Sequence, residues 1–147
     1  FVAVADHSRI AFTQRYPDET QRSAAAFLRT AVGHFERLGV PIQRVLTDNG
    51  MSFRSALFAS ACLAMGLSQK FTRAYRPQTN GKAERFIPSA LREWAYGRVY
   101  ANSDQRRAAL PVWNHCYNWH RPHHGINLMP PMSRLSMPRK NLLTLHT

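Results

Sequence analysis

Cysteines and long apolar runs are scarce in this chain of 147 residues, and each shortage excludes a class of protein. The two cysteines, Cys62 and Cys116, lack the regular spacing of a disulfide framework, which favours the reducing cytoplasm over a secreted location. No apolar run approaches the roughly 20 residues that a membrane-spanning helix needs. We therefore expect a cytoplasmic globular protein without a membrane partner.

Acidic residues are also few, and the positive charge is unevenly distributed. The net charge is +12, from 20 Lys and Arg against 8 Asp and Glu. Residues 70–140 carry 13 basic residues against three acids, whereas residues 1–69 carry seven against five. A one-sided positive field attracts polyanions, and arginine, which outnumbers lysine here, suits phosphate. The distribution favours nucleic acid as a partner, ahead of a basic protein with a merely solvated charged face.

Strand and helix patterns are mixed along the chain and predict an α/β fold with one core. Short apolar runs predict strands at 1–5, 10–16, 45–46 and 67–71. Helical periodicity predicts helices at 20–38, 55–65, 81–100, 103–119 and 132–135. We place a boundary at residue 100, so that 1–100 is the core and 101–147 is a helical extension of the same core with a Pro-rich basic tail.

Two acids, separated by 35 residues, lie in the most informative segments. Asp48 follows a predicted buried strand, and Glu84 lies in the first turn of a predicted helix. Taken alone, Asp48 could simply accept hydrogen bonds from nearby backbone amides in a turn. Taken alone, Glu84 could simply interact favourably with the positive end of the helix macrodipole. Together, and flanked by basic residues, they predict carboxylates gathered around a hard divalent cation.

The order of the motifs resembles the catalytic core of insertion-sequence transposases and retroviral integrases. The matching segments are Asp6–Arg9, Thr47–Gly50, Tyr75–Arg85, Tyr117–His123 and Pro130-Pro131. The Tyr-Asn-x-x-Arg-Pro-His pattern is nearest to the bacterial insertion-sequence branch. The resemblance implies a ribonuclease-H-like mixed sheet flanked by helices. It also implies metal-dependent phosphoryl transfer on DNA with Mg²⁺ or Mn²⁺, comprising end nicking and strand transfer.

The resemblance also implies roles for individual residues. Asp48 and Glu84 match the family's second and third acids, which are both catalytic and metal-binding. The loop and helix around Glu84 contact DNA in the family, through phosphates, sugars or base edges. The DNA-binding candidates are Arg73, Arg76, Gln78, Asn80, Lys82 and Arg85. Asn80 is alternatively only the N-cap of the helix. Transposon ends, target DNA and further copies of the chain are the implied partners.

The family's first acid lies on a strand that this sequence does not contain. Residue 1 is Phe, and we expect the natural start to lie upstream. Asp6 is not a substitute, because it matches a non-ligating acid near the end of the second strand. We therefore expect an inactive fragment of low stability. Its sheet should either have a gap or pair residues 1–5 directly with residues 44–47.

Three other interpretations are weaker. The chain could be a non-catalytic DNA-binding remnant or inhibitor, which the missing acid favours. It could be a ribonuclease-H-like nuclease, but such enzymes lack the Gln78–Phe86 loop. The cluster Cys116, His120, His123 and His124 suggests zinc, but its spacing matches no zinc-finger pattern.

Within the 81–100 helix, Pro88 predicts a bend that would displace Glu84.

Overall fold

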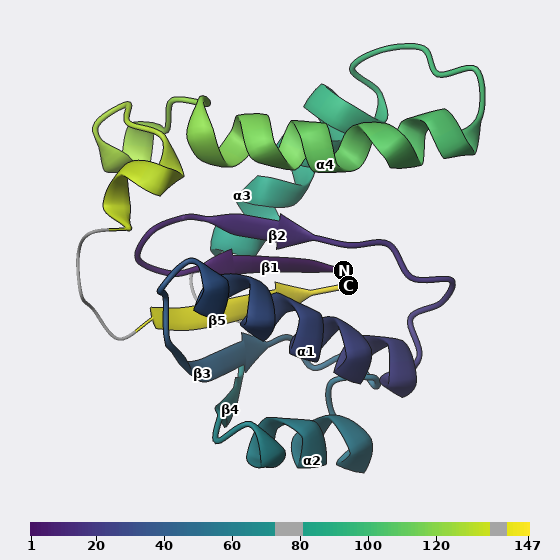
Figure 1. Ribbon diagram of the computed structural model, residues 1–147. Helices are drawn as coiled ribbons and strands as arrows, with labels where there is room; N and C mark the ends of the chain where they lie inside the picture. The colour runs from purple at the N-terminus through teal and green to yellow at the C-terminus, as the bar shows by residue number, and fades with distance from the viewer. Residues whose placement is uncertain (73–80, 136–140) are drawn as a thin grey trace.

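A five-stranded mixed sheet forms the centre of the computed structural model, which describes residues 1–72, 81–135 and 141–147 (Figure 1). The strand order is β2-β1-β5-β3-β4. Strand β1 runs antiparallel to β2 and β5, whereas β3 runs parallel to β5 and β4. The strands are β1 (Val2–Ala5), β2 (Ala11–Thr13), β3 (Ile42–Thr47), β4 (Ser68–Phe71) and β5 (Asn141–His146).

Helices cover both faces of this sheet. One face packs on α1 (Gln21–Arg37) and α2 (Ala56–Ala64), and alternate residues Ala3 and Ala5 of β1 point into that core. The intervening Val4 points to the other face, toward α3 (Gly81–Ala90) and α4 (Ser103–Trp119). None of the described helices is long and apolar enough to cross a membrane.

The starts and ends of α1, α2 and α4 agree with the sequence prediction because local features determine them. Thr20, Ser55 and Asn102 are N-caps, each accepting a hydrogen bond from the backbone N–H three residues later. Gly39 and Gly66 end α1 and α2 in the left-handed region, at φ 71° and 66°, where glycine has no steric penalty. These features set where the helices begin and end.

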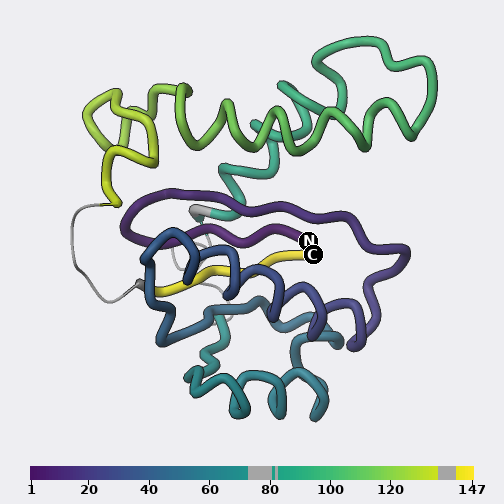
Figure 2. Tube along the Cα trace, in the orientation of Figure 1, coloured from purple at the N-terminus to yellow at the C-terminus, as the bar shows by residue number. Residues whose placement is uncertain are grey.

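Strand β5 corrects the predicted sheet. From the sequence we expected a gap beside residues 1–5, or direct pairing of residues 1–5 with 44–47, and both expectations are wrong. Instead β5 lies between β1 and β3, so the two chain ends lie side by side at the centre of the sheet (Figure 2). Leu143 and Leu145 of β5 are fully buried. The strand therefore completes the backbone pairing and adds to the core.

The segment after residue 81 also differs in detail from the prediction. Helix α3 ends at Ala90 and continues as a π-helical turn, Leu91–Ala95 (η2), instead of running to about residue 100. Helix α4 spans 103–119 as predicted, and short 3₁₀ turns follow at His124–Ile126 (η3) and Pro131–Arg134 (η4). The expected helical character of the 101–147 segment does not extend to β5. The boundary at residue 100 stays a prediction.

Candidate active site and the motif residues around it

Asp48 lies at the carboxyl end of β3 in a tight turn. Its Oδ1 accepts a hydrogen bond from the backbone N–H of Gly50 at 2.8 Å. A Cβ on residue 50 would lie 2.9 Å from this oxygen, so glycine leaves room for the carboxylate. Asn49 donates to the carbonyl of Thr72 at 3.0 Å and joins the turn to the end of β4. The turn thus occupies one carboxylate oxygen and leaves Oδ2 for another partner.

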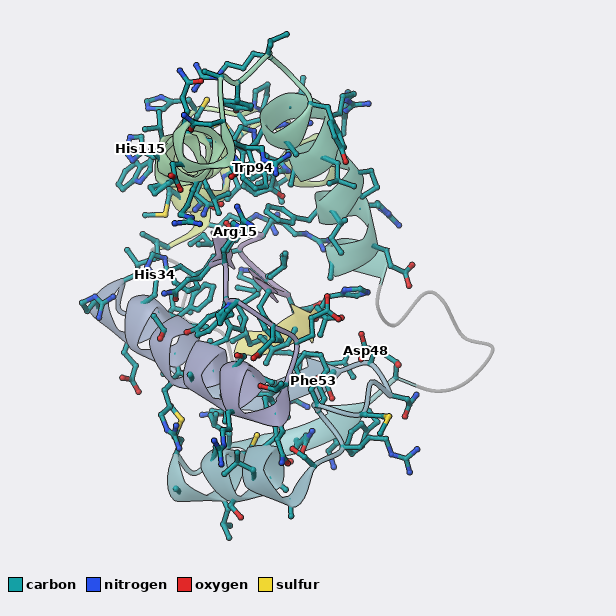
Figure 3. The ribbon with its side chains drawn as sticks, turned by 90° about the vertical axis from the view of Figure 1, so that its right-hand side faces the viewer. Arg15, His34, Asp48, Phe53, Trp94 and His115 are labelled. Atoms are coloured by element: carbon teal, nitrogen blue, oxygen red, sulfur yellow. The ribbon has the colours of Figure 1, made fainter. Side chains whose placement is uncertain are left out.

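His146 of β5 is the neighbour of that second oxygen. Leu145 pairs with Thr47 in the parallel register, which places the following residues, His146 and Asp48, side by side. The distance from His146 Nε2 to Asp48 Oδ2 is 3.7 Å, too long for a hydrogen bond. Figure 3 shows Asp48 at the edge of the molecule, far from the labelled His34 and His115. We did not predict His146, because only long-range strand pairing brings it to Asp48.

Glu84 lies in the first turn of α3 with its side chain exposed. The neighbouring Ala83 and Phe86 are buried. Phe86 packs in a cluster with Val4 of β1, and these contacts anchor α3 to the sheet. Arg85 is exposed beside Glu84. Four of the remaining DNA-binding candidates lie outside the described residues: Arg73, Arg76, Gln78 and Asn80. For Lys82, the backbone is described and the side chain is not.

The described residues do not assemble the metal site that the resemblance implies. Within 1–72, 81–135 and 141–147, no three side chains of His, Cys, Asp or Glu gather closely enough to hold a metal ion. Magnesium prefers oxygen ligands, whereas β5 gives Asp48 an imidazole neighbour. The described residues therefore do not by themselves form a complete magnesium site. The roles of Asp48 and Glu84 as metal ligands stay predictions.

The Asp6–Arg9 motif forms the turn between β1 and β2. The N–H of Asp6 donates to the carbonyl of Leu142, and the N–H of Arg9 donates to the carbonyl of Ala5 at 3.0 Å. Arg9 has φ 67°, which places a non-glycine residue in the left-handed region. Asp6 is thus a residue of the strand end and turn, as its position in the motif predicts.

The motif residue Asn118 of α4 seals the edge of the sheet. Its side-chain oxygen accepts from the N–H of Ala11 at 2.9 Å, and its side-chain nitrogen donates to the carbonyl of Ala11 at 2.8 Å. One helical turn earlier, Asn114 donates to the carbonyl of Thr13 at 3.4 Å. Because β2 is an edge strand, these two amides take the place of a neighbouring strand.

The rest of the Tyr117–His123 motif builds a ring and ion-pair cluster. Tyr117 packs edge-on against Phe86 and His123, with ring centroids 4.8 and 4.7 Å apart. Arg121 pairs with Glu93 through two nitrogens, at 2.7 Å from Nη2 to Oε1 and 3.0 Å from Nε to Oε2. Burial raises the pKa of Glu93, but the hydrogen bonds and charge of Arg121 outweigh it and hold this pKa below its ordinary value.

The sheet order, the helices on both faces and the acid at the end of β3 define a ribonuclease-H-like fold, as the resemblance implied. Two sequence profiles, each described as an integrase core domain, match the chain at residues 1–77 and 65–131. The chain belongs to the integrase core domain family.

Individual proteins are similar over most of the chain. The putative integrase ORF3 of Spiroplasma virus SpV1-C74 is 23% identical over 146 residues, covering 90% of this chain and 40% of that protein. The chain thus spans less than half the length of this relative. The catalytic core domain of BIV integrase superposes with a TM-score of 0.67 at 23% identity, covering 90% of this chain and 81% of that chain.

A chain of the simian T-cell lymphotropic virus intasome, in complex with the PP2A regulatory subunit B56 gamma, superposes with a TM-score of 0.71 at 21% identity. This match covers 90% of the present chain and 46% of the viral chain. At these identities the two structural matches establish the fold alone.

Proposed function

We propose that this chain is the catalytic part of a DNA transposition or integration protein, which nicks the ends of a mobile DNA and joins them to target DNA. Membership of the integrase core domain family carries the proposal. Asp48 at the carboxyl end of β3, Glu84 in the first turn of α3 and the net charge of +12 support it. Further copies of the chain on DNA, Mg²⁺ or Mn²⁺ and a cytoplasmic location are parts of the same proposal.

The chemistry of this class is phosphoryl transfer. A water molecule or a DNA 3′-hydroxyl attacks a backbone phosphorus, and the bridging oxygen departs with its strand. We assign Asp48 and Glu84 as the acids of this reaction and propose that the 147-residue chain is inactive by itself. The reason is that β5 places the imidazole of His146 beside Asp48, and that no three metal-ligating side chains of the described residues gather at one point.

The test is a strand-transfer assay with Mg²⁺ or Mn²⁺ on a duplex that carries the ends of the mobile element. Protein expressed from the whole reading frame should produce joined DNA, and Asp48→Asn and Glu84→Gln should each abolish the product. The matched control is Glu36→Gln, which removes an exposed acid of α1 and should join as the unmodified protein does. The 147-residue chain should give no product, and joining by it that depends on Asp48 would contradict its inactivity.

A non-catalytic DNA-binding protein, which covers the DNA ends without cutting them, is the second candidate. The observation that favours it is the imidazole of His146 beside Asp48, 3.7 Å from its Oδ2. The same assay separates the two candidates when DNA binding is measured in parallel. Protein from the whole reading frame that binds the ends tightly and never joins them would support the second candidate.

A further inference from the structure

A basic pocket of about 220 Å³ lies between the β1–β2 turn, α3 and the end of α4. Three arginines from distant parts of the sequence line it, namely Arg9 of the turn, Arg85 of α3 and Arg121 after α4. His123 and His124 stand beside them. All three arginines belong to the motifs singled out in the sequence, so these motifs converge on this pocket.

The walls of the pocket combine an apolar floor with polar groups. Val4, Phe86 and Tyr117 form the floor, and the Arg121 guanidinium lies 5.8 Å from the centre of the Tyr117 ring. The Nε2 atom of His123 is buried and has no hydrogen-bond partner in the described part of the chain. The pocket therefore contains one buried polar atom, His123 Nε2, without a partner among the described residues.

The charges around the pocket remain positive after its carboxylates are counted. Glu93 occupies Nε and Nη2 of Arg121, whereas Nη1 of Arg121 donates to no described residue. Burial lowers the pKa of the Arg9 guanidinium, Asp6 raises it, and the nearby charge of Arg85 lowers it further. No carboxylate of the described residues forms an ion pair with Arg85. Arg9 and Arg85 thus bring two like charges to the pocket, beside the nearby carboxylate of Asp6.

The backbone of Arg9 gives a separate indication. Its φ of 67° lies in the left-handed region, where glycine is favoured. The turn itself uses only backbone groups of Arg9, through the bond from its N–H to the carbonyl of Ala5. The arginine side chain is therefore not needed to build the turn, and strained residues of this kind cluster at functional sites.

We propose that this pocket binds a backbone phosphate of DNA through Arg9, Arg85 and Arg121. Each guanidinium group can donate two parallel hydrogen bonds to phosphate oxygens, which the point charge of a lysine ammonium cannot do. Val4 in the floor of the pocket pairs with Thr144, and Thr144 pairs with Leu46, so Val4 lies two strands from β3, roughly 10 Å across the sheet. Arg85 directly follows Glu84 in α3, so a phosphate held there would lie near this candidate acid. The inference rests on the proposed function only in naming DNA as the source of the phosphate.

The test compares three variants of the chain by fluorescence anisotropy with labelled DNA duplexes of two unrelated sequences. Arg9→Gly and Arg85→Gln should each weaken binding about tenfold on both sequences, and each should lower the salt dependence by about one phosphate contact. The control is Arg92→Gln, whose side chain is 75% exposed and outside the pocket, and it should change binding less than twofold. Because glycine suits the backbone at residue 9, Arg9→Gly should keep the melting temperature of the unmodified chain.

Four outcomes decide between the pocket and the proposed catalysis. Equal binding by the Arg9, Arg85 and Arg92 variants would overturn the inference. The inference would also be overturned if inorganic phosphate raised the melting temperature only when Arg9 is present, while DNA affinity did not depend on Arg9. The pocket would then bind free phosphate. If Arg9→Gly weakens DNA binding but no protein joins DNA in the strand-transfer assay, the pocket is supported and the proposed catalysis is refuted. Joining by Arg9→Gly at unchanged DNA affinity would refute the pocket alone.

Discussion

At the scale of single residues, Asn118 has the clearest structural role among the motif residues. Its side chain is buried and forms both a donated and an accepted hydrogen bond with the backbone of Ala11. Replacing it by leucine of similar size leaves two buried backbone groups without partners. We predict that Asn118→Leu lowers the free energy of unfolding by about 2–4 kcal/mol, measured by urea denaturation monitored by circular dichroism.

The matched control for this prediction lies on the same helix. Arg107 is 62% exposed, and its ion-pair partner among the described residues is Asp104, which is 81% exposed. Arg107→Ala should therefore change the free energy of unfolding by less than about 0.5 kcal/mol. If Asn118→Leu were as mild as this control, the amide would not be the partner of the β2 edge.

The ion pair between Glu93 and Arg121 should make the free energy of unfolding depend on pH. The pKa of Glu93 is held below the ordinary 4.5 by Arg121, against the opposing effect of burial. The stabilisation by the pair is therefore fully present above pH 4.5 and is lost as the pH falls through the lowered pKa. Glu93→Gln should cost about 1–2 kcal/mol at pH 7, and this difference should shrink as the pH falls below 4.5. A difference that stays constant between pH 7 and pH 3 would contradict the ion pair.

At the scale of elements, the π-helical turn after α3 depends on a glycine. A Cβ on Gly97 would lie 2.4 Å from the carbonyl oxygen of Glu93, so any side chain forces the backbone to shift. Gly97→Ala should lower the melting temperature and cost about 1–3 kcal/mol. Gly125→Ala is the matched control, because a Cβ there meets no atom within 4 Å. Equal effects of the two substitutions would mean that the turn adapts without cost.

Elements specified by local signals could be predicted from the sequence, and elements specified by distant pairing could not. The caps Thr20, Ser55 and Asn102 act within one turn of their helices, so α1, α2 and α4 were confirmed with boundaries close to those predicted. Strand β5 follows a Pro-rich basic stretch and has no turn motif of its own, so the sequence predicts only a tail there. Its place is set by pairing with β1 and β3, which no local pattern encodes.

The same distinction applies to the candidate site. The position of Asp48 at the end of a strand followed from the apolar residues before it and from the Asn49-Gly50 turn. The position of His146 depends on the register between β5 and β3. His146 and Asp48 are 98 residues apart in the sequence. The basic pocket likewise joins residues from three segments. Motif order predicted the family, and only the fold shows which motif residues meet.

At the scale of the whole molecule, β5 decides whether the chain is one cooperative unit. It occupies the centre of the sheet and pairs on both sides, with β1 and with β3. Without it, two inner strand edges would be left with unpaired backbone groups, which promotes association between chains. With it present, we now expect the 147-residue chain to unfold in a single transition, in place of the low stability expected from a gapped sheet.

The corresponding experiment compares this chain with one that ends at Leu135. Removing β5 takes Leu143 and Leu145 out of the core, each worth about 1.5–3 kcal/mol of burial, and exposes both strand edges. We predict that the shortened chain loses its sharp thermal transition and sediments as dimers or larger species, while the full chain melts cooperatively. Adding a peptide of residues 136–147 should restore the transition, and a scrambled peptide of the same composition should not. A shortened chain that stays monomeric with an unchanged melting temperature would show that β5 does not complete the sheet in solution.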